Sequence, residues 1–207
     1  MTLRIGLEPQ PQLDAVLGLL SAAGLPVAAV HGLQRQPGIV EDGDVAWVRA
    51  PGGDLLSWCQ GGGLDLAVVG KESLLEDEPE VYELLDLRVA PATLVFATAA
   101  ATGEGRSGRL RVATRFPRLT ARHFAAGGLQ VQPVGLTSDA TIAVSLGLAD
   151  GVVELDTLLA EAASGLVRRD TVAPCGARLV AGRAARALRG AEVAALVVRL
   201  RDLLAQR

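Results

Sequence analysis

The segment Asp65-Leu-Ala-Val-Val-Gly-Lys71 carries the clearest structural signal in this chain, and it continues as Glu-Ser-Leu-Leu-Glu76. An apolar run of the buried-strand type stops at Gly70, and a charged helix pattern begins at Lys71. Such a strand end exposes backbone N–H groups and one mobile cation at the carboxyl edge of a sheet. Ligands of open α/β sheets bind at that edge, and helix N-termini favour phosphates. The segment therefore predicts an α/β sheet, with either a ligand edge or a strand end shaped by packing alone.

Strand and helix patterns alternate on both sides of this segment. Before it, we expect strands over residues 3–7, 44–50 and 64–69, with helices over residues 13–23 and from about residue 54 to 60. This order is typical of right-handed βαβ units in a parallel sheet. After it, the patterns predict the following elements: helix 74–85, strand 88–98, strand 110–113, helix 117–126, strand 129–133, helix 140–146, strand 151–155, strand 172–180 and helix 184–204.

Two lobes follow from a Gly-containing, small-residue stretch at 99–108 that suits a loop. We expect a discontinuous lobe I of residues 1–93 plus 173–207, and a lobe II of residues 94–172. Two connections between α/β lobes form a hinge, and we expect a cleft between the lobes.

Composition limits the function. Half of the 207 residues are apolar, only 3% are aromatic and the net charge is −3, which argues against a nucleic-acid partner. Cys59 and Cys175 form no metal-type pair, so we interpret both as buried apolar residues and expect no metal cluster. The sequence shows neither a signal-peptide pattern nor an apolar run of bilayer length, which predicts a cytoplasmic protein without a membrane partner.

Four collinear motifs carry a family resemblance: residues 65–71, Tyr-Glu-Leu-Leu-Asp-Leu at 82–87, Arg-Val-Ala-Thr-Arg-Phe-Pro at 111–117 and Gly-Leu-Ala-Asp-Gly-Val-Val-Glu at 147–154. Together they resemble the short form of ATP phosphoribosyltransferase, and the resemblance covers nearly the whole chain. It implies a two-lobed α/β fold similar to type II periplasmic binding proteins, with mostly parallel sheets and the active site in the cleft.

The resemblance also implies an activity and partners. The family joins N1 of ATP to C1 of phosphoribosyl pyrophosphate, releases pyrophosphate with Mg²⁺ present, and so begins histidine biosynthesis. A short-form subunit would form a homodimer within a hetero-oligomer that includes a regulatory subunit resembling histidyl-tRNA synthetase.

Site residues carried over from the family fall into three groups. Catalytic roles go to Arg49 and, on a looser loop alignment, to Arg35. Nucleotide-binding roles go to the strand-end segment, namely Asp65, Leu66, Val69, Gly70 and Lys71. Roles in binding phosphoribosyl pyrophosphate go to Glu154, Asp156 and Thr157. No metal ligand is assigned, because Mg²⁺ would arrive with the substrate phosphates.

Ordinary structural interpretations remain open for these residues. Arg49 can be a solvated strand-end arginine, Lys71 a surface lysine and Asp65 a solvated acid at a strand start. We interpret Arg115 as a surface residue at a helix entry, and His123 as a structural residue rather than a general base.

Three departures from the family pattern lie at substrate-binding loops. Leu7-Glu8-Pro9-Gln10 replaces the usual L-P-K-G-R-L, so two cations are lost and Glu8 adds a negative charge. Residues 153–160 retain an acid and one hydroxyl but lack the glycine and second hydroxyl of the phosphate loop. Residues 138–141 read Ser-Asp-Ala-Thr where G-S-x-E is usual. Two hypotheses follow: a divergent active transferase, or a catalytically degenerate homologue that acts as a regulatory subunit or ligand-binding module.

Overall fold

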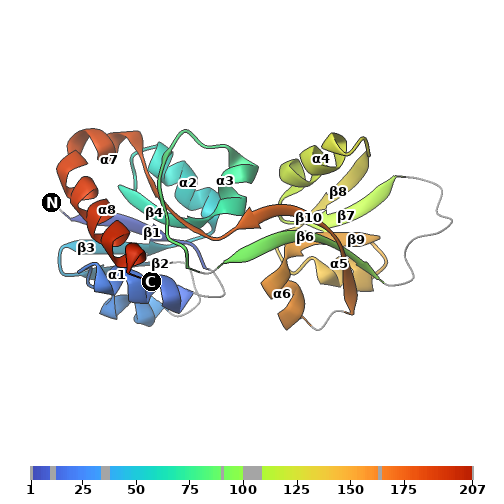
Figure 1. The fold of residues 1–207 in the computed structure, drawn as a ribbon, viewed down its shortest axis with the longest axis horizontal. Helices are drawn as coiled ribbons and strands as arrows, with labels where there is room; N and C mark the ends of the chain where they lie inside the picture. The colour runs from blue at the N-terminus through green and yellow to red at the C-terminus, as the bar shows by residue number, and fades with distance from the viewer. Residues whose placement is uncertain are drawn as a thin grey trace. The chain divides into compact units, whose positions relative to one another are not determined.

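The protein is described by a computed structural model that covers residues 2–9, 13–33, 38–89, 91–99, 109–162 and 165–206. The chain forms two compact units. Figure 1 shows both, coloured by residue number from blue at the N-terminus to red at the C-terminus. Lobe I comprises Met1–Pro91 and Gly176–Arg207, and lobe II comprises Ala92–Cys175. Each lobe contains one sheet with helices packed on it.

Lobe I is built on a six-stranded sheet with the order β2-β3-β1-β4-β11-β5. The strands are β1 Leu3–Leu7, β2 Gly38–Asp42, β3 Val45–Arg49, β4 Leu66–Gly70, β5 Tyr82–Asp86 and β11 Ala177–Ala181. The helices are α1 Leu13–Ala22, the 3₁₀ helix η1 Ala28–Leu33, α2 Gly52–Gln60, α3 Lys71–Asp77, α7 Arg183–Leu188 and α8 Gly190–Ala205. The central strands β3, β1 and β4 run parallel, whereas the β2, β11 and β5 pairings are antiparallel.

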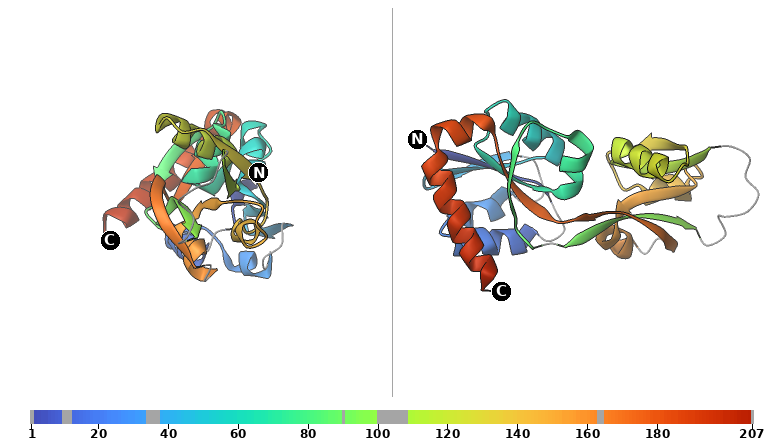
Figure 2. Two further views of the ribbon diagram at one scale, coloured as in Figure 1. Left: turned by 90° about the vertical axis from the view of Figure 1, so that its right-hand side faces the viewer. Right: turned by 45° about the horizontal axis from the view of Figure 1, so that its top comes forward.

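Apolar side chains on both faces of this sheet explain the two helical layers. One core cluster joins Ile5 and Val68 to Leu17 of α1 and Leu200 of α8. A second cluster joins Val69 to buried residues of α2 and α3, including Cys59. The views in Figures 1 and 2 show α8 lying beside α1, with which it is in contact. The strands near the sheet centre are buried on both faces, as their unbroken apolar runs predict.

Lobe II is built on a five-stranded sheet with the order β10-β6-β9-β7-β8. The strands are β6 Ala92–Ala99, β7 Leu110–Thr114, β8 Val131–Gly135, β9 Gly151–Leu155 and β10 Leu166–Cys175, and the helices are α4 Pro117–Ala126, α5 Thr141–Ser145 and α6 Asp156–Glu161. Strands β9, β7 and β8 are parallel, and the β6 pairings are antiparallel. The two-lobed α/β class is confirmed, and both sheets are mixed: β3-β1-β4 and β9-β7-β8 are parallel, and the other pairings are antiparallel.

The helix expected over residues 74–85 is not formed as a single helix. Helix α3 ends at Asp77, because Glu78 adopts a left-handed conformation with φ of 46° and Pro79 follows. Residues 82–86 then form β5, which pairs with β11. Pairing with a distant strand overrides the local helix preference of this segment.

Two further boundaries differ from the sequence patterns. The single strand expected over 172–180 is two strands, β10 in lobe II and β11 in lobe I, divided at Gly176 with φ of 144°. The closing helix is likewise divided into α7 and α8 at Arg189, whose φ of −129° is not helical. Strand β2 was not expected at all, since it lies on the sheet edge and its side chains are at most half-buried.

In each lobe, one parallel strand pair begins with the same pair of hydrogen bonds between an aspartate and an arginine. The backbone N–H of Asp65 donates to the Arg4 carbonyl at 3.0 Å, and the Arg4 N–H donates to the Asp65 carboxylate at 2.8 Å. In lobe II, Asp150 and Arg111 form the same reciprocal pair, at 2.8 Å and 2.9 Å. Each aspartate immediately precedes its strand, so it fixes the pairing of β4 with β1 and of β9 with β7.

Helix length and polarity bear on membrane insertion. Within the described ranges, no helix has the length and apolar character needed to cross a bilayer.

Candidate functional site

The carboxyl edge of the lobe I sheet gathers three strand ends. Leu7 of β1 lies in register with Arg49 of β3 on one side and Val68 of β4 on the other. The chain therefore leaves these neighbouring strands at Glu8, Ala50 and Lys71. This edge of a parallel sheet is the usual location of ligand sites in α/β proteins.

Glu8 lies at the centre of this edge. Its Oε2 accepts a hydrogen bond from the Gly70 N–H at 2.6 Å, and its Oε1 accepts one from the Ser73 hydroxyl at 2.9 Å. Its backbone N–H donates to the Val68 carbonyl at 3.0 Å, which extends the β1–β4 pairing. The Glu8 carboxylate, which the family pattern lacks, therefore accepts hydrogen bonds from Gly70 at the end of β4 and from Ser73 of α3.

Two glycines give the acidic side chains room. A Cβ on Gly52 would lie 2.5 Å from Glu8 Oε1, and a Cβ on Gly70 would overlap the carboxylate of Glu72. Gly70 itself has φ of −70° and ψ of 147°, a conformation that any residue adopts. Gly70 is thus required for space rather than for backbone conformation.

Arg49 ends β3 at the same edge and is buried, not solvated. Glu72 and Glu76 of α3 are buried as well. Because isolated buried charges are costly, a lobe that buries a guanidinium and two carboxyl groups needs a specific polar arrangement around them. The surface interpretation of Arg49 is therefore wrong, and its predicted catalytic role stays a prediction.

Lys71 belongs to a chain of ion pairs along the edge of the lobe. Its Nζ lies 2.6 Å from Glu83 Oε2, and Glu83 Oε1 lies 3.1 Å from Arg178 Nε. Arg178 also contacts Asp86, at 2.8 Å. These pairs are partly exposed, so a phosphate could compete for Lys71 at modest cost.

The other expected nucleotide-binding residues do not reach this edge. Asp65 precedes β4 at the opposite end of the strand, about 20 Å from Lys71 at 3.3 Å per residue. There its carboxylate accepts the Arg4 N–H and lies 3.6 Å from Arg189 Nε. Leu66 and Val69 are fully buried in the two cores. The structure brings Gly70 and Lys71 together with Glu8 and Arg49, and it leaves Asp65, Leu66 and Val69 outside.

Arg35 lies outside the described residues. Its expected catalytic role is therefore untouched by the geometry of the site.

The carboxyl edge of the lobe II sheet has a different construction. Leu155 ends β9 and Asp156 begins α6, so the strand runs directly into the helix. Asp156 Oδ1 accepts hydrogen bonds from the N–H groups of Thr93 at 3.0 Å and Thr157 at 2.9 Å. The Asp156 side chain thus accepts a hydrogen bond from the Thr157 N–H at the start of this helix.

Glu154 forms a two-point ion pair with Arg115. The Arg115 Nη2 and Nε atoms lie 2.7 Å and 3.0 Å from the two Glu154 carboxylate oxygens. The Leu155 N–H donates to the same carboxylate at 2.8 Å, and only 3% of the Glu154 side chain is exposed. Arg115 lies at the entry of α4 with 33% of its side chain exposed, as expected, and it is in addition the partner of the buried Glu154. Thr114 and Val153 are in register, so Arg115 and Glu154, the next residue after each, lie opposite each other. The sequence alone does not give this register.

His123 of α4 contacts β10, and its interpretation as a structural residue stays a prediction. Its Nε2 lies 2.9 Å from Asp170 Oδ2 on β10. The pKa of Asp170 is lowered, first by the hydrogen bond from the Thr171 N–H and then by His123. This pair ties α4 to the sheet.

Both cysteines are buried, as the sequence predicts. Burial, with a smaller effect from the charge of Asp65, raises the pKa of Cys59 to about 12. Cys59 is therefore a protonated core residue at neutral pH.

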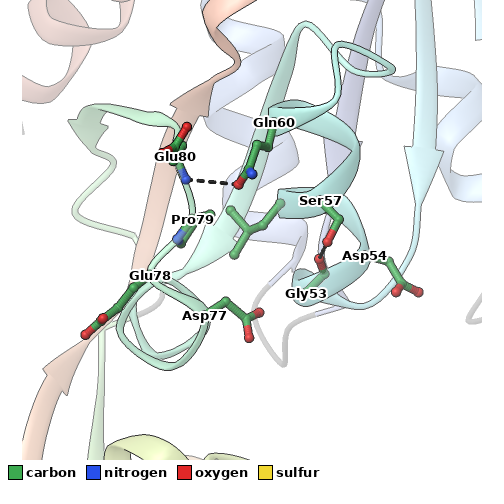
Figure 3. A pocket seen from close by; sticks show the side chains of 9 residues that line it. Gly53, Asp54, Ser57, Gln60, Asp77, Glu78, Pro79 and Glu80 are labelled. Atoms are coloured by element: carbon green, nitrogen blue, oxygen red, sulfur yellow. Dashed lines mark hydrogen bonds between the residues drawn. The ribbon is translucent and has the colours of Figure 1, made fainter.

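Figure 3 shows a pocket of about 540 Å³ in lobe I, between α2 and the segment after α3. The Gln60 side-chain oxygen accepts the Glu80 N–H at 3.0 Å across it. Four of its lining side chains are acidic: Asp54, Asp77, Glu78 and Glu80. This charge disfavours nucleotide phosphates there.

No group of three or more His, Cys, Asp and Glu side chains that could hold a metal ion occurs in the part of the chain that the structure describes.

Known structures define the class of this fold. The ATP phosphoribosyl transferase (HisG:HisZ) complex from Thermotoga maritima matches with a TM-score of 0.80 and 19% identity over the whole of both chains. The periplasmic aliphatic sulphonate binding protein SsuA from Escherichia coli matches with a TM-score of 0.61 and 17% identity, covering 96% of this chain and 71% of that protein. The chain therefore has the two-lobed α/β fold of periplasmic binding proteins.

Sequence relatives narrow this class to one family. The family model HisG: ATP phosphoribosyltransferase matches residues 52–202. The ATP phosphoribosyltransferase of Symbiobacterium thermophilum is 34% identical over 206 residues, covering 89% of this chain and 93% of that protein. That of Pseudomonas paraeruginosa is 35% identical over 210 residues, covering 99% and 98%. The chain belongs to the ATP phosphoribosyltransferase family, whose enzymes are phosphoribosyltransferases of histidine biosynthesis.

Proposed function

We propose that this chain performs the reaction of its family, the transfer of a phosphoribosyl group from phosphoribosyl pyrophosphate to N1 of ATP. The observation that carries this proposal is the match to curated ATP phosphoribosyltransferases over nearly the full length of both proteins. Neither lobe is missing from the match.

The chemistry asks the protein to position two substrates and to stabilise phosphate oxygens. N1 of adenine forms a bond to C1 of the ribose while the C1–O bond to pyrophosphate breaks, and the bonding electrons leave with the pyrophosphate. Positive charge grows on the ribose and negative charge on the leaving group, so no protein nucleophile is needed. An arginine fits the second task, because its planar fork donates two parallel hydrogen bonds to a phosphate.

We assign the nucleotide to the carboxyl edge of lobe I, with Gly70 and Lys71 as binding residues and Arg49 as a catalytic residue. Asp65, Leu66 and Val69 would then hold β4 in place rather than contact the ligand. Arg35 keeps its place in the proposal on the family resemblance alone.

Phosphoribosyl pyrophosphate belongs in this proposal to lobe II, near Glu154, Asp156 and Thr157. Mg²⁺ would arrive with the phosphates of the two substrates. The HisG of Thermotoga maritima forms a complex with HisZ, which supports a regulatory subunit for this chain too. A subunit similar to histidyl-tRNA synthetase, a homodimer within the hetero-oligomer, and a cytoplasmic location complete the proposal.

A second candidate function is a catalytically degenerate subunit that senses or binds ligands. The observation that favours it is the direct passage from β9 into α6, with both acids engaged by Arg115, Thr93 and Thr157. A substrate phosphate at this point must compete with bonds that the protein already makes.

One assay separates the two functions. Purified chain is mixed with ATP, phosphoribosyl pyrophosphate and Mg²⁺, with and without a HisZ-type subunit, and phosphoribosyl-ATP is followed by its absorbance. Product in either mixture supports the transferase. No product in both, together with calorimetric binding of ATP, AMP, histidine or phosphoribosyl pyrophosphate, supports the degenerate subunit.

Arg49 provides the site-specific test of the transferase. Arg49→Ala should lower kcat/KM by at least about tenfold, because a hydrogen bond to a charged group contributes about 1.5–3 kcal/mol. Arg49→Lys keeps the buried charge but not the fork, and circular dichroism checks that both variants fold. An unchanged kcat/KM in a folded Arg49→Ala would remove Arg49 from the site.

A further inference from the structure

The two connections between the lobes differ in length. Strand pairing joins Asp86 to Arg178 in lobe I, and Ala92 to Cys175 in lobe II. Between these two pairs, the first connection contains residues 87–91 and the second contains residues 176–177. The first connection therefore has extra chain.

Part of this extra chain forms a bulge within lobe I. The Leu87 N–H donates to the Ala177 carbonyl at 3.0 Å, and the Ala177 N–H donates to the Val89 carbonyl at 3.4 Å. Residues 87–89 thus lie opposite one residue of β11, as in a β-bulge. Leu87 and Val89 are buried in the lobe I core, whereas Arg88 between them is exposed.

Arg88 carries the backbone strain of this bulge. Its φ of 50° lies in the left-handed region, which is unfavourable for a residue with a Cβ and persists where the surroundings hold it. The Asp86 carboxylate holds it here, because its Oδ1 accepts the Arg88 N–H at 2.9 Å and lies 2.8 Å from Arg178 Nη1. One oxygen atom thus joins the bulge to β11, into which the second connection leads.

We propose that Asp86 restrains the bulge at residues 87–89, and that its release lets the first connection extend and the two lobes change their distance. Hinges of this kind move through large dihedral changes at a few residues. An extended Arg88 would lose its strain and give the connection roughly one residue more of reach, about 3.3 Å. Val89 would have to leave the core, so the restrained form predominates in the unsubstituted protein.

Two measurements on the full chain test this proposal. Hydrogen–deuterium exchange reports the opening of the bulge at the amides of residues 87–89. Double electron–electron resonance reports the distance between the lobes, with spin labels on Glu41→Cys in lobe I and Gln132→Cys in lobe II. Both of these positions are exposed, whereas the native Cys59 and Cys175 are buried, so the label reaches the introduced cysteines.

Asp86→Ala removes the acceptor of the Arg88 N–H. Exchange at residues 87–89 should rise about tenfold, the factor expected for one hydrogen bond to a charged group, and the distribution of distances between the lobes should broaden. Asp14→Ala is the matched control, because it removes an exposed carboxylate from α1 of the same lobe. It should change neither measurement, and equal changes in Asp14→Ala would assign the effect to net charge and overturn the proposal.

Substitutions of Arg88 test the strain while Asp86 stays in place. Glycine adopts the left-handed conformation readily, so Arg88→Gly should slow the exchange about fivefold and narrow the distance distribution. A β-branched residue tolerates this conformation least, so Arg88→Val should change both measurements in the same direction as Asp86→Ala. Should Asp86→Ala fail to fold, this pair of variants decides.

Three results would overturn the proposal. The first is an Asp86→Ala variant that matches the unsubstituted protein in both measurements. The second is raised exchange with unchanged distances, because Asp86 would then hold the bulge but not the lobes. The third is equal behaviour of Arg88→Gly and Arg88→Val. Neither measurement needs turnover, so this proposal and the proposed transferase stand or fall separately.

Discussion

The carboxyl edges of the two sheets each hold a glutamate, but they hold it differently. In lobe I, Glu8 is bonded to a backbone N–H and a hydroxyl, both neutral. In lobe II, Glu154 faces the Arg115 guanidinium through two hydrogen bonds. The Glu8 carboxylate thus accepts hydrogen bonds from the end of β4 and from the first turn of α3. A carboxylate on a guanidinium is neutralised, and the pair fills the edge as one unit.

Because of this difference, we expect substitutions at the two edges to have different effects. Loss of the acid in lobe I leaves the Gly70 N–H and the buried Ser73 hydroxyl without this acceptor. Loss of the base in lobe II leaves a buried negative charge, which is among the costliest defects a fold can carry. We therefore expect substitution of these contacts to cost more stability in lobe II than in lobe I.

Arg115→Ala should have the largest effect. Glu154 would remain buried without its guanidinium, and we expect a loss of about 3 kcal/mol in the free energy of unfolding of lobe II, measured by denaturant titration. Arg109→Ala, which removes an exposed arginine beside β7, should change stability by less than about 0.5 kcal/mol. Adding Glu154→Gln to Arg115→Ala should recover part of the loss, and equal losses in Arg115→Ala and Arg109→Ala would contradict the contrast.

Ser73→Ala should have an intermediate effect. It removes one of the two neutral donors to Glu8, and we expect a loss of about 1 kcal/mol in the unfolding free energy of lobe I. The matched control is Ser57→Ala, because the Ser57 hydroxyl donates to the Gly53 carbonyl on an exposed part of α2 and has little to lose. A cost for Ser57→Ala as large as that for Ser73→Ala would mean that the Glu8 contact adds nothing.

His123→Ala should have the smallest effect, on an exposed carboxylate of lobe II. The pKa of Asp170 lies below its ordinary value of 3.8, so its contribution to stability is present above that value and is lost as pH falls through the lowered pKa. Without His123, we expect the pKa of Asp170 to rise toward 3.8, but not fully, because the larger cause, the Thr171 N–H, remains. Carbon-detected NMR titration measures this shift. His31→Ala in lobe I should leave the Asp170 titration unchanged, and a fixed pKa in His123→Ala would show that the imidazole does not act on it.

Strands with unbroken apolar runs were predictable from the sequence. The strands at residues 3–7 and 151–155 have the expected bounds, and β4 has nearly the expected ones, because burial on both faces leaves a clear pattern. Strand β5 was not predictable, since Tyr82–Asp86 is polar at several positions and is a strand only through its pairing with β11.

The candidate site was predictable only where it coincided with a strand end. Gly70 ends β4 and Lys71 follows it, and both lie at the expected edge. Glu8, Glu154 and Asp156 each also have a partner that is distant in sequence, namely Gly70, Arg115 and Thr93. These contacts depend on strand pairing that no local pattern gives. Asp65 was placed in the ligand set because it belongs to the same motif as Lys71, although a five-residue strand separates the two edges.

Asp65 and Asp150 also mark equivalent positions in the two lobes. The strand partner of Asp65 is Arg4, and the strand partner of Asp150 is Arg111. Four residues after Arg4 lies Glu8, and four residues after Arg111 lies Arg115. These two residues thus occupy one equivalent position in two half-molecules, and they carry opposite charges there. The chain therefore has an acid at this position in lobe I and a base at the equivalent position in lobe II, and the base is paired with Glu154.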